Sequence, residues 1–207
     1  MQTLYNDAMD YSQFEDWLSE KFASLDEKSA RFAKCHRWNM FLPQNYQRIR
    51  ADMDEQGIPP DVVDIGCGAG FGSAFFLDGV YVGVDRRHPH IGFGTLAKQL
   101  SSQFYNEGQA NVSYLIDTFP SDAISEVLKK KTMIASMSLG VYSEASGNDW
   151  KKIFDAYCNG MKTASGIYLC VPVEFAKYVK DFFGEYREIG GCNDGGDENL
   201  PIIYVEP

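Results

Sequence analysis

The segment VVDIGCGAGFG, residues Val62–Gly72, joins a short apolar run to a series of alternating glycines. The apolar run follows the breaker EQGIPPD, residues 55–61, and predicts a buried strand over Val62–Ile65. A short helix is expected over Phe71–Leu77, so the glycines lie in a strand-to-helix turn. Glycine permits a positive φ there and lets a ligand approach the main chain without a Cβ in the way. The turn therefore predicts a polar or anionic ligand that lies on the bare backbone, near the free N–H groups of the following helix.

Beyond this turn, β-rich segments alternate with segments of helical pattern. The expected strands are 80–85, 111–117, 132–139, 166–173, 186–191 and 200–206, and the expected helices are 95–105, 121–130, 149–161 and 174–183. Alternation of this kind indicates right-handed β-α-β crossovers, and continuous apolar runs indicate strands that are buried on both faces. The sequence therefore predicts a doubly wound α/β domain over residues 58–207, and the helical patterns of residues 1–57 predict an N-terminal helical extension.

Composition and charge exclude several classes of protein. Of the 207 residues, 44% are hydrophobic, which supports a sizeable core and argues against a disordered chain. The formal net charge of −10 argues against a nucleic-acid partner, because an anionic protein repels a polyanion. The five cysteines form no C-x-x-C pair, the first residues show no secretion pattern, and no apolar run approaches the roughly 18 residues of a membrane span. We therefore expect a cytoplasmic protein with reduced thiols and no membrane partner.

Asp85 ends the second expected strand, 21 residues after Asp64. A carboxylate at the tip of that strand can accept both hydroxyls of a ribose, so the two strands predict a nucleoside-bearing cofactor. An ion pair with the neighbouring Arg86 is the alternative role. The dinucleotide fingerprint G-x-G-x-x-G requires a glycine where this chain has Phe71, which argues against a nicotinamide cofactor. No cluster of His, Cys or acidic residues has the spacing of a metal site, so no metal is expected.

The spacing D-x-G-x-G-x-G over Asp64–Gly70 resembles the first motif of the class I S-adenosylmethionine-dependent methyltransferases. Asp85 and Asp117, at the tips of the second and third expected strands, fit the same family. The resemblance implies a Rossmann-like fold with a seven-stranded, mostly parallel sheet, and S-adenosylmethionine as cofactor. Two features depart from the family: the fourth strand has no acid near its start, and no N/D-P-P-Y/F segment follows it. The second departure argues against methylation of an adenine, cytosine or glutamine amino group.

The resemblance also implies roles for individual residues at the strand ends. The residues implied to bind the cofactor are Asp64, Gly66, Cys67, Gly68, Gly70, Asp85, Arg86, Asp117, Thr118 and Ser138. Within that set, Asp85 would bind the ribose. Asp117 would face the adenine amino group, with Ile116 and Thr118 flanking the ring.

The segment SLGVYSEAS, residues 138–146, leaves the fourth strand where the family places its methyl acceptor. Tyr142 and Glu144 are candidates to orient or deprotonate an acceptor, and a polar loop without a catalytic role is the alternative. A basic segment at residues 28–50 has six Lys and Arg residues and no acidic residue. It allows a lid, in which Arg37 and Trp38 close over the cofactor's carboxylate and the acceptor. A guanidinium suits that task because it offers two parallel donors to a carboxylate. A solvated helix face is the alternative role of this segment.

These features favour an S-adenosylmethionine-dependent methyltransferase that transfers a methyl group directly, in line, to a small-molecule acceptor. Since the sulfonium is already activated, the protein mainly has to hold the acceptor in line and exclude water. An RNA or protein methyltransferase is one alternative, favoured by the basic and aromatic N-terminal segment. A non-catalytic module that binds S-adenosylmethionine is another, because a fold alone does not establish chemistry. The oligomeric state is left open.

Overall fold

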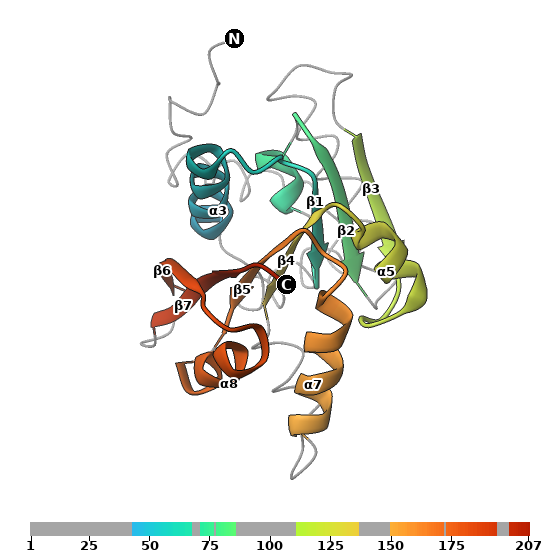
Figure 1. The fold of residues 1–207 in the computed structure, drawn as a ribbon. Coiled ribbons are helices and arrows are strands. Elements are labelled where there is room, and N and C mark those ends of the chain that lie inside the picture. Colours follow the sequence, from blue (N-terminus) through green and yellow to red (C-terminus); the bar gives the residue numbers. More distant parts are fainter. Residues whose placement is uncertain are drawn as a thin grey trace, which may run out of the picture. The chain divides into compact units, whose positions relative to one another are not determined.

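The computed structural model describes residues 43–67, 71–76, 78–85, 111–136, 150–171, 173–193 and 199–207. The chain divides into two compact units, Met1–Asn39 and Met40–Pro207, and all of the described residues belong to the second unit. Figure 1 shows this unit as a sheet with helices packed against it. The expected helix over 95–105 lies outside the described residues, as do residues 1–42 of the expected extension. The role of that extension as a lid stays a prediction.

A seven-stranded sheet forms the centre of the unit, with the strand order β3-β2-β1-β4-β5-β7-β6 (Figure 1). The strands are β1 Val62–Ile65, β2 Val80–Asp85, β3 Asn111–Ile116, β4 Thr132–Ser136, β5 Gly166–Cys170, β6 Arg187–Asn193 and β7 Asn199–Val205. The first five strands pair in parallel, whereas β7 is antiparallel to both β5 and β6. This arrangement confirms the predicted doubly wound, mostly parallel sheet.

Helices after β1, β3, β4 and β5 lie where the sequence predicts them, and a further helix precedes β1. They are α3 Pro43–Gln56, η1 Phe71–Phe75, α5 Asp122–Leu128, α7 Trp150–Met161 and α8 Val173–Phe183, where η1 is a 3-10 helix. Ser121 caps α5, as expected, because its hydroxyl accepts the N–H of Ile124 at 3.2 Å. The helix expected to reach residue 77 is a single 3-10 segment that ends at Phe75.

The hydrophobic core lies between the sheet and helices α5, α7 and α8. Alternate residues of each strand point to this face, since successive side chains of a strand lie on opposite sides of the sheet. The strands contribute Val63, Val82, Val84, Met133, Ala135, Ile167, Leu169 and Ile203, and the helices contribute Ile124, Leu128, Phe154, Cys158, Met161 and Val179. Because β1 to β5 pair in parallel, their carboxyl ends meet at one edge of the sheet, and this cluster packs against one face of it.

Helix α3 packs on the other side of the sheet and is bonded to both halves of it. The Tyr46 hydroxyl donates to the carboxylate of Asp64 in β1 at 2.7 Å. Asp52, six residues further along the helix, accepts the hydroxyl of Tyr168 in β5 at 2.6 Å. The helix therefore connects the first strand of the sheet to its C-terminal half.

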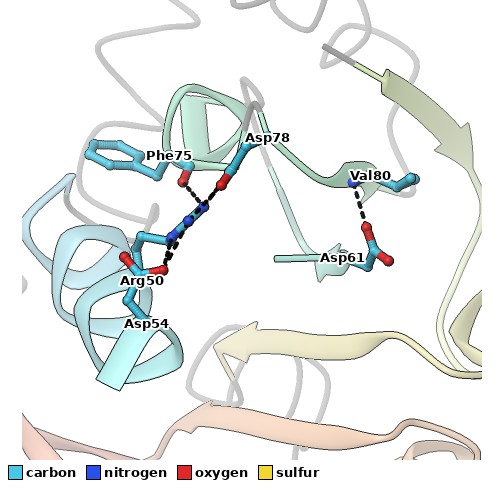
Figure 2. Close-up of polar contacts among 6 residues, drawn as sticks. All are labelled: Arg50, Asp54, Asp61, Phe75, Asp78 and Val80. Carbon is cyan, nitrogen blue, oxygen red and sulfur yellow. Dashed lines mark hydrogen bonds and ion pairs between the residues drawn. The ribbon is translucent and has the colours of Figure 1, made fainter. Parts of the chain in front are cut away.

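Arg50 of α3 is only 4% exposed and binds the segment between η1 and β2. Its guanidinium donates to Asp54 (Nε to Oδ1, 2.9 Å), to Asp78 (Nη2 to Oδ2, 2.7 Å) and to the carbonyl of Phe75 (3.4 Å) (Figure 2). Next to these contacts, the carboxylate of Asp61 accepts the N–H of Val80 at 2.8 Å, where β2 begins. The basic N-terminal segment was expected to be a solvated face or part of a lid, and Arg50 fits neither role because it is buried in ion pairs.

Candidate functional site

The carboxyl ends of β1, β2 and β3 lie next to one another at one edge of the sheet. Asp85 at the end of β2 pairs in register with Ile116 at the end of β3. Main-chain hydrogen bonds join the ends: the N–H of Asp117 donates to the Asp85 carbonyl at 3.1 Å, and the N–H of Gly66 donates to the Val84 carbonyl at 2.8 Å. The start of the glycine turn is thus bonded to the end of β2, where Asp85 lies, and Asp117 is bonded to Asp85 from the end of β3.

Gly66 has the backbone conformation that the motif predicts. Its φ is +76°, in the left-handed region that favours glycine. A Cβ built at this position would have no heavy atom within 4 Å, so the described part of the structure leaves open space on that side of the main chain. The N–H groups of Gly66 and Cys67 both donate to the carbonyl of Val84, at 2.8 and 3.1 Å, which ties the start of the turn to β2.

Asp64 is buried, with 1% of its surface exposed, and one of its carboxylate oxygens has two donors. Its Oδ2 accepts the hydroxyl of Tyr46 at 2.7 Å and that of Tyr81 at 2.6 Å. Burial raises the pKa of the Asp64 carboxyl from its ordinary value of 3.8 to about 6; the two hydroxyls oppose this rise and the charge of Asp85 adds to it. The sequence predicts Asp64 as a cofactor residue, and its direct contact with a cofactor stays a prediction.

The two tyrosines were not predicted from the sequence. They lie 18 and 17 residues from Asp64 and in different elements, so no local spacing identifies them. What the sequence does show is an acid, Asp64, in the middle of an apolar strand, and a buried carboxylate of this kind requires a hydrogen-bond donor. Near this group, burial raises the pKa of the Cys67 thiol, and the charges of Asp64 and Asp85 contribute to the rise. The thiol therefore stays protonated and is unsuited to act as a nucleophile.

Asp117 follows β3, and its carboxylate is fixed by two hydrogen bonds. It accepts the N–H of Thr118 at 2.7 Å and the hydroxyl of Ser121, the residue that caps α5. The bond from Ser121, followed by that from Thr118, lowers the pKa of Asp117. The neighbouring Ile116 is 46% exposed and is the one large hydrophobic side chain that stands out to solvent within the described ranges. An ionised acid and an exposed apolar side chain thus lie together at the strand end where the adenine was expected.

Several predicted site residues lie outside the described part of the chain. They are Arg37, Trp38, Gly68, Gly70, Arg86, Ser138, Tyr142 and Glu144. Among the residues that are described, no group of three or more His, Cys, Asp or Glu side chains could hold a metal ion. In the same part of the chain, the helices are too short or too polar to cross a membrane.

Solved structures match this chain over most of its length. The magnesium protoporphyrin IX methyltransferase of Synechocystis PCC 6803, solved with bound S-adenosylmethionine, aligns with a TM-score of 0.54 and 14% identity over 88% of this chain and 86% of its own. The chain has the methyltransferase fold. At the level of the fold, this confirms the Rossmann-like methyltransferase architecture that the motif Asp64–Gly70 implied.

Other proteins share the methyltransferase fold with this chain at similarly low sequence identity. The methyltransferase domain of bacterial CtHen1-CN aligns with a TM-score of 0.54 and 13% identity, over 79% of this chain and 98% of that domain. A SAM-dependent methyltransferase from Agrobacterium tumefaciens aligns with a TM-score of 0.53 and 9% identity, over 78% of this chain and 60% of its own. No family model matches the sequence. No curated protein matches it either.

Proposed function

We propose that this protein is an S-adenosylmethionine-dependent methyltransferase with a small-molecule acceptor. The observation that carries the proposal is the main chain at Gly66, which no other described residue covers, at the same sheet edge as the strand-tip acids Asp85 and Asp117, in a chain with the methyltransferase fold. In doubly wound sheets, ligands bind at this edge, beyond the carboxyl ends of the strands. The structure of the Synechocystis enzyme contains S-adenosylmethionine, which supports the same cofactor for this chain.

The residues at the strand ends fit the parts of this cofactor. Asp85 would accept the two ribose hydroxyls. Asp117 would accept the adenine amino group, because an ionised carboxylate has about four acceptor positions and two of them are used by Thr118 and Ser121. Ile116 would pack against the adenine ring, which would explain its exposure. The open side of Gly66 would receive the cofactor along the main chain.

S-adenosylmethionine supplies a methyl group that is already activated by the sulfonium. The protein then has to hold the acceptor in line and keep water away, which is positioning rather than covalent chemistry. We assign the acceptor side to the segment after β4 that contains Tyr142 and Glu144, with Glu144 or Tyr142 as the base that a weakly acidic acceptor needs. Ser138, at the start of that segment, stays a proposed cofactor residue. Arg37 and Trp38 remain the proposed lid.

The net charge favours a small acceptor over a nucleic acid. At −10, the chain repels a polyanion. The basic N-terminal segment is the feature that favours RNA, but Arg50, one of its six cations, is already bonded to Asp54 and Asp78. The side chains of Cys67, Cys158 and Cys170 are buried, and the five cysteines form no C-x-x-C pair, which supports the proposed cytoplasmic location. A non-catalytic module would bind the cofactor but show no methyl transfer to any acceptor from a cell extract.

Replacing Asp85 with alanine should weaken the binding of S-adenosylhomocysteine by roughly 1–3 kcal/mol, or about 5- to 150-fold, because hydrogen bonds to a charged group are lost. Isothermal titration calorimetry measures the change directly. Asp155 is a half-buried acid in α7, and Asp155→Ala is the matched control with an unchanged affinity. Equal affinities of the wild type and Asp85→Ala would refute the ribose assignment, and a wild-type protein that binds neither S-adenosylmethionine nor S-adenosylhomocysteine would refute the proposed function.

A further inference from the structure

Tyr46 contacts both ends of the glycine turn. Its hydroxyl donates to Asp64, two residues before Gly66, at 2.7 Å. Its ring lies against Gly72, where a Cβ would come within 2.6 Å of the ring atoms Cε1 and Cζ and within 2.9 Å of the Asp64 Oδ2. Gly72 lies two residues beyond Gly70, the last glycine of the motif. The two flanks of the turn therefore meet on one side chain of α3.

Tyr81 completes this contact from the sheet. Its hydroxyl donates to the same oxygen of Asp64 at 2.6 Å. Its ring stacks on Phe76, just after η1, with 6.3 Å between the ring centroids, and the Tyr46 ring stacks on Phe75 at 5.8 Å. The rings of both tyrosines thus pack against the end of η1, while both hydroxyls bind the end of β1.

The main chain at the start of the turn is fixed as well, because Gly66 and Cys67 both donate to the Val84 carbonyl. A turn that is held in one conformation before its ligand arrives loses less entropy on binding. We infer that Tyr46 and Tyr81 are positioning residues for the cofactor turn: acting through Asp64, they hold the main chain at Gly66 in the conformation that receives the cofactor. This inference rests on the proposed function.

A second buried bond between a tyrosine hydroxyl and a carboxylate lies elsewhere in the chain and serves as a control. Tyr168 of β5 donates to Asp52 of α3 at 2.6 Å, and Arg187 binds the same carboxylate, with Nη2 2.8 Å from Oδ2. This bond also joins a buried tyrosine to an acid across the interface of α3 with the sheet, but it lies in the C-terminal half of the sheet, away from the turn. Removing the Tyr168 hydroxyl therefore reproduces the loss of a tyrosine–carboxylate bond without touching the site.

The test uses Tyr46→Phe, Tyr81→Phe and Tyr168→Phe in the full-length chain. Each variant keeps its ring and loses one hydroxyl. We expect the dissociation constant for S-adenosylhomocysteine to rise about fivefold in Tyr46→Phe and in Tyr81→Phe, and to stay within about twofold of wild type in Tyr168→Phe. We also expect amide hydrogen exchange over residues 62–67 of the unliganded protein to become about fivefold faster in the first two variants only.

Equal behaviour of the three variants, in affinity and in exchange, would overturn the inference and leave the tyrosines a purely structural role. If the wild type fails to bind S-adenosylhomocysteine, the proposed function fails. The exchange measurement then decides the inference by itself, because it needs no ligand. Selective opening of residues 62–67 in Tyr46→Phe and Tyr81→Phe would support the tyrosines as the residues that hold this turn, and uniform opening would overturn it.

Discussion

Asp64→Asn is expected to make the protein more stable than the wild type at pH 7, by up to about 3 kcal/mol, and to leave the stability near pH 4 almost unchanged. The reason is the buried carboxyl, whose pKa rises from its ordinary value of 3.8 to about 6 on folding. Between pH 3.8 and about pH 6, the native state binds more protons than the unfolded chain. The contribution of this carboxyl to the free energy of unfolding therefore falls as the pH rises through this range, and it is constant above about pH 6. A shift of that size corresponds to roughly 3 kcal/mol.

Asparagine keeps the shape of the side chain and an acceptor for the tyrosine hydroxyls without the buried charge. Chemical denaturation of both proteins from pH 4 to pH 8 gives the difference in unfolding free energy. Asp117→Asn is the control with the opposite pH dependence, because folding lowers the pKa of Asp117. The ionised Asp117 stabilises the fold above its ordinary pKa, and this stabilisation is lost as the pH falls. A difference between Asp64→Asn and wild type that does not change between pH 4 and pH 6 would contradict the account of this buried group.

Gly66→Ala is expected to reduce the affinity for S-adenosylhomocysteine about 30-fold, or by about 2 kcal/mol. The residue has a φ of +76°, no described heavy atom would lie within 4 Å of its Cβ, and the proposed cofactor approaches the main chain on that side. Alanine in the left-handed region also costs about 1–2 kcal/mol of stability, so a stability control is required. Calorimetric titration of the folded variant separates the two effects.

Gly57 provides that control. It has a φ of +67°, no heavy atom of the described ranges would lie within 4 Å of its Cβ, and it precedes β1 at the opposite end of the strand. Gly57→Ala should therefore lose a similar amount of stability and keep the wild-type affinity for S-adenosylhomocysteine. If the two alanine variants bind this ligand equally well, the cofactor does not lie against Gly66.

The sequence predicts the sheet and the placement of its strand-end acids because both depend on local pattern. The apolar run Val62–Ile65 and the alternation of strands and helices determine the parallel order, and parallel order places Asp85 and Asp117 at one edge. The cap at Ser121 was also predictable, since capping depends on residues three positions apart. The helix after the turn was predicted too long; in the structure it ends at Phe75, and the carbonyl of that residue accepts the Arg50 side chain.

The contacts of α3 could not be predicted in the same way. Asp52 binds Tyr168 and Arg187, which lie 116 and 135 residues further along the chain. Tyr46 reaches Asp64 only because α3 packs on the side of β1 to which Asp64 points. Such contacts depend on where α3 packs in the folded chain, and the spacing of residues in the sequence does not predict that position. The basic segment that ends at Arg50 appeared to be a surface feature for the same reason.

Mapping the binding of S-adenosylhomocysteine by amide chemical shifts tests the central claim most directly, because it locates the ligand without any substitution. If the ends of β1, β2 and β3 bind the adenosine, the amide signals of Gly66, Asp85 and Asp117 should shift during the titration, while those of β6 stay in place. No shifts at all, or shifts confined to β6 and β7, would contradict a cofactor site at this edge of the sheet.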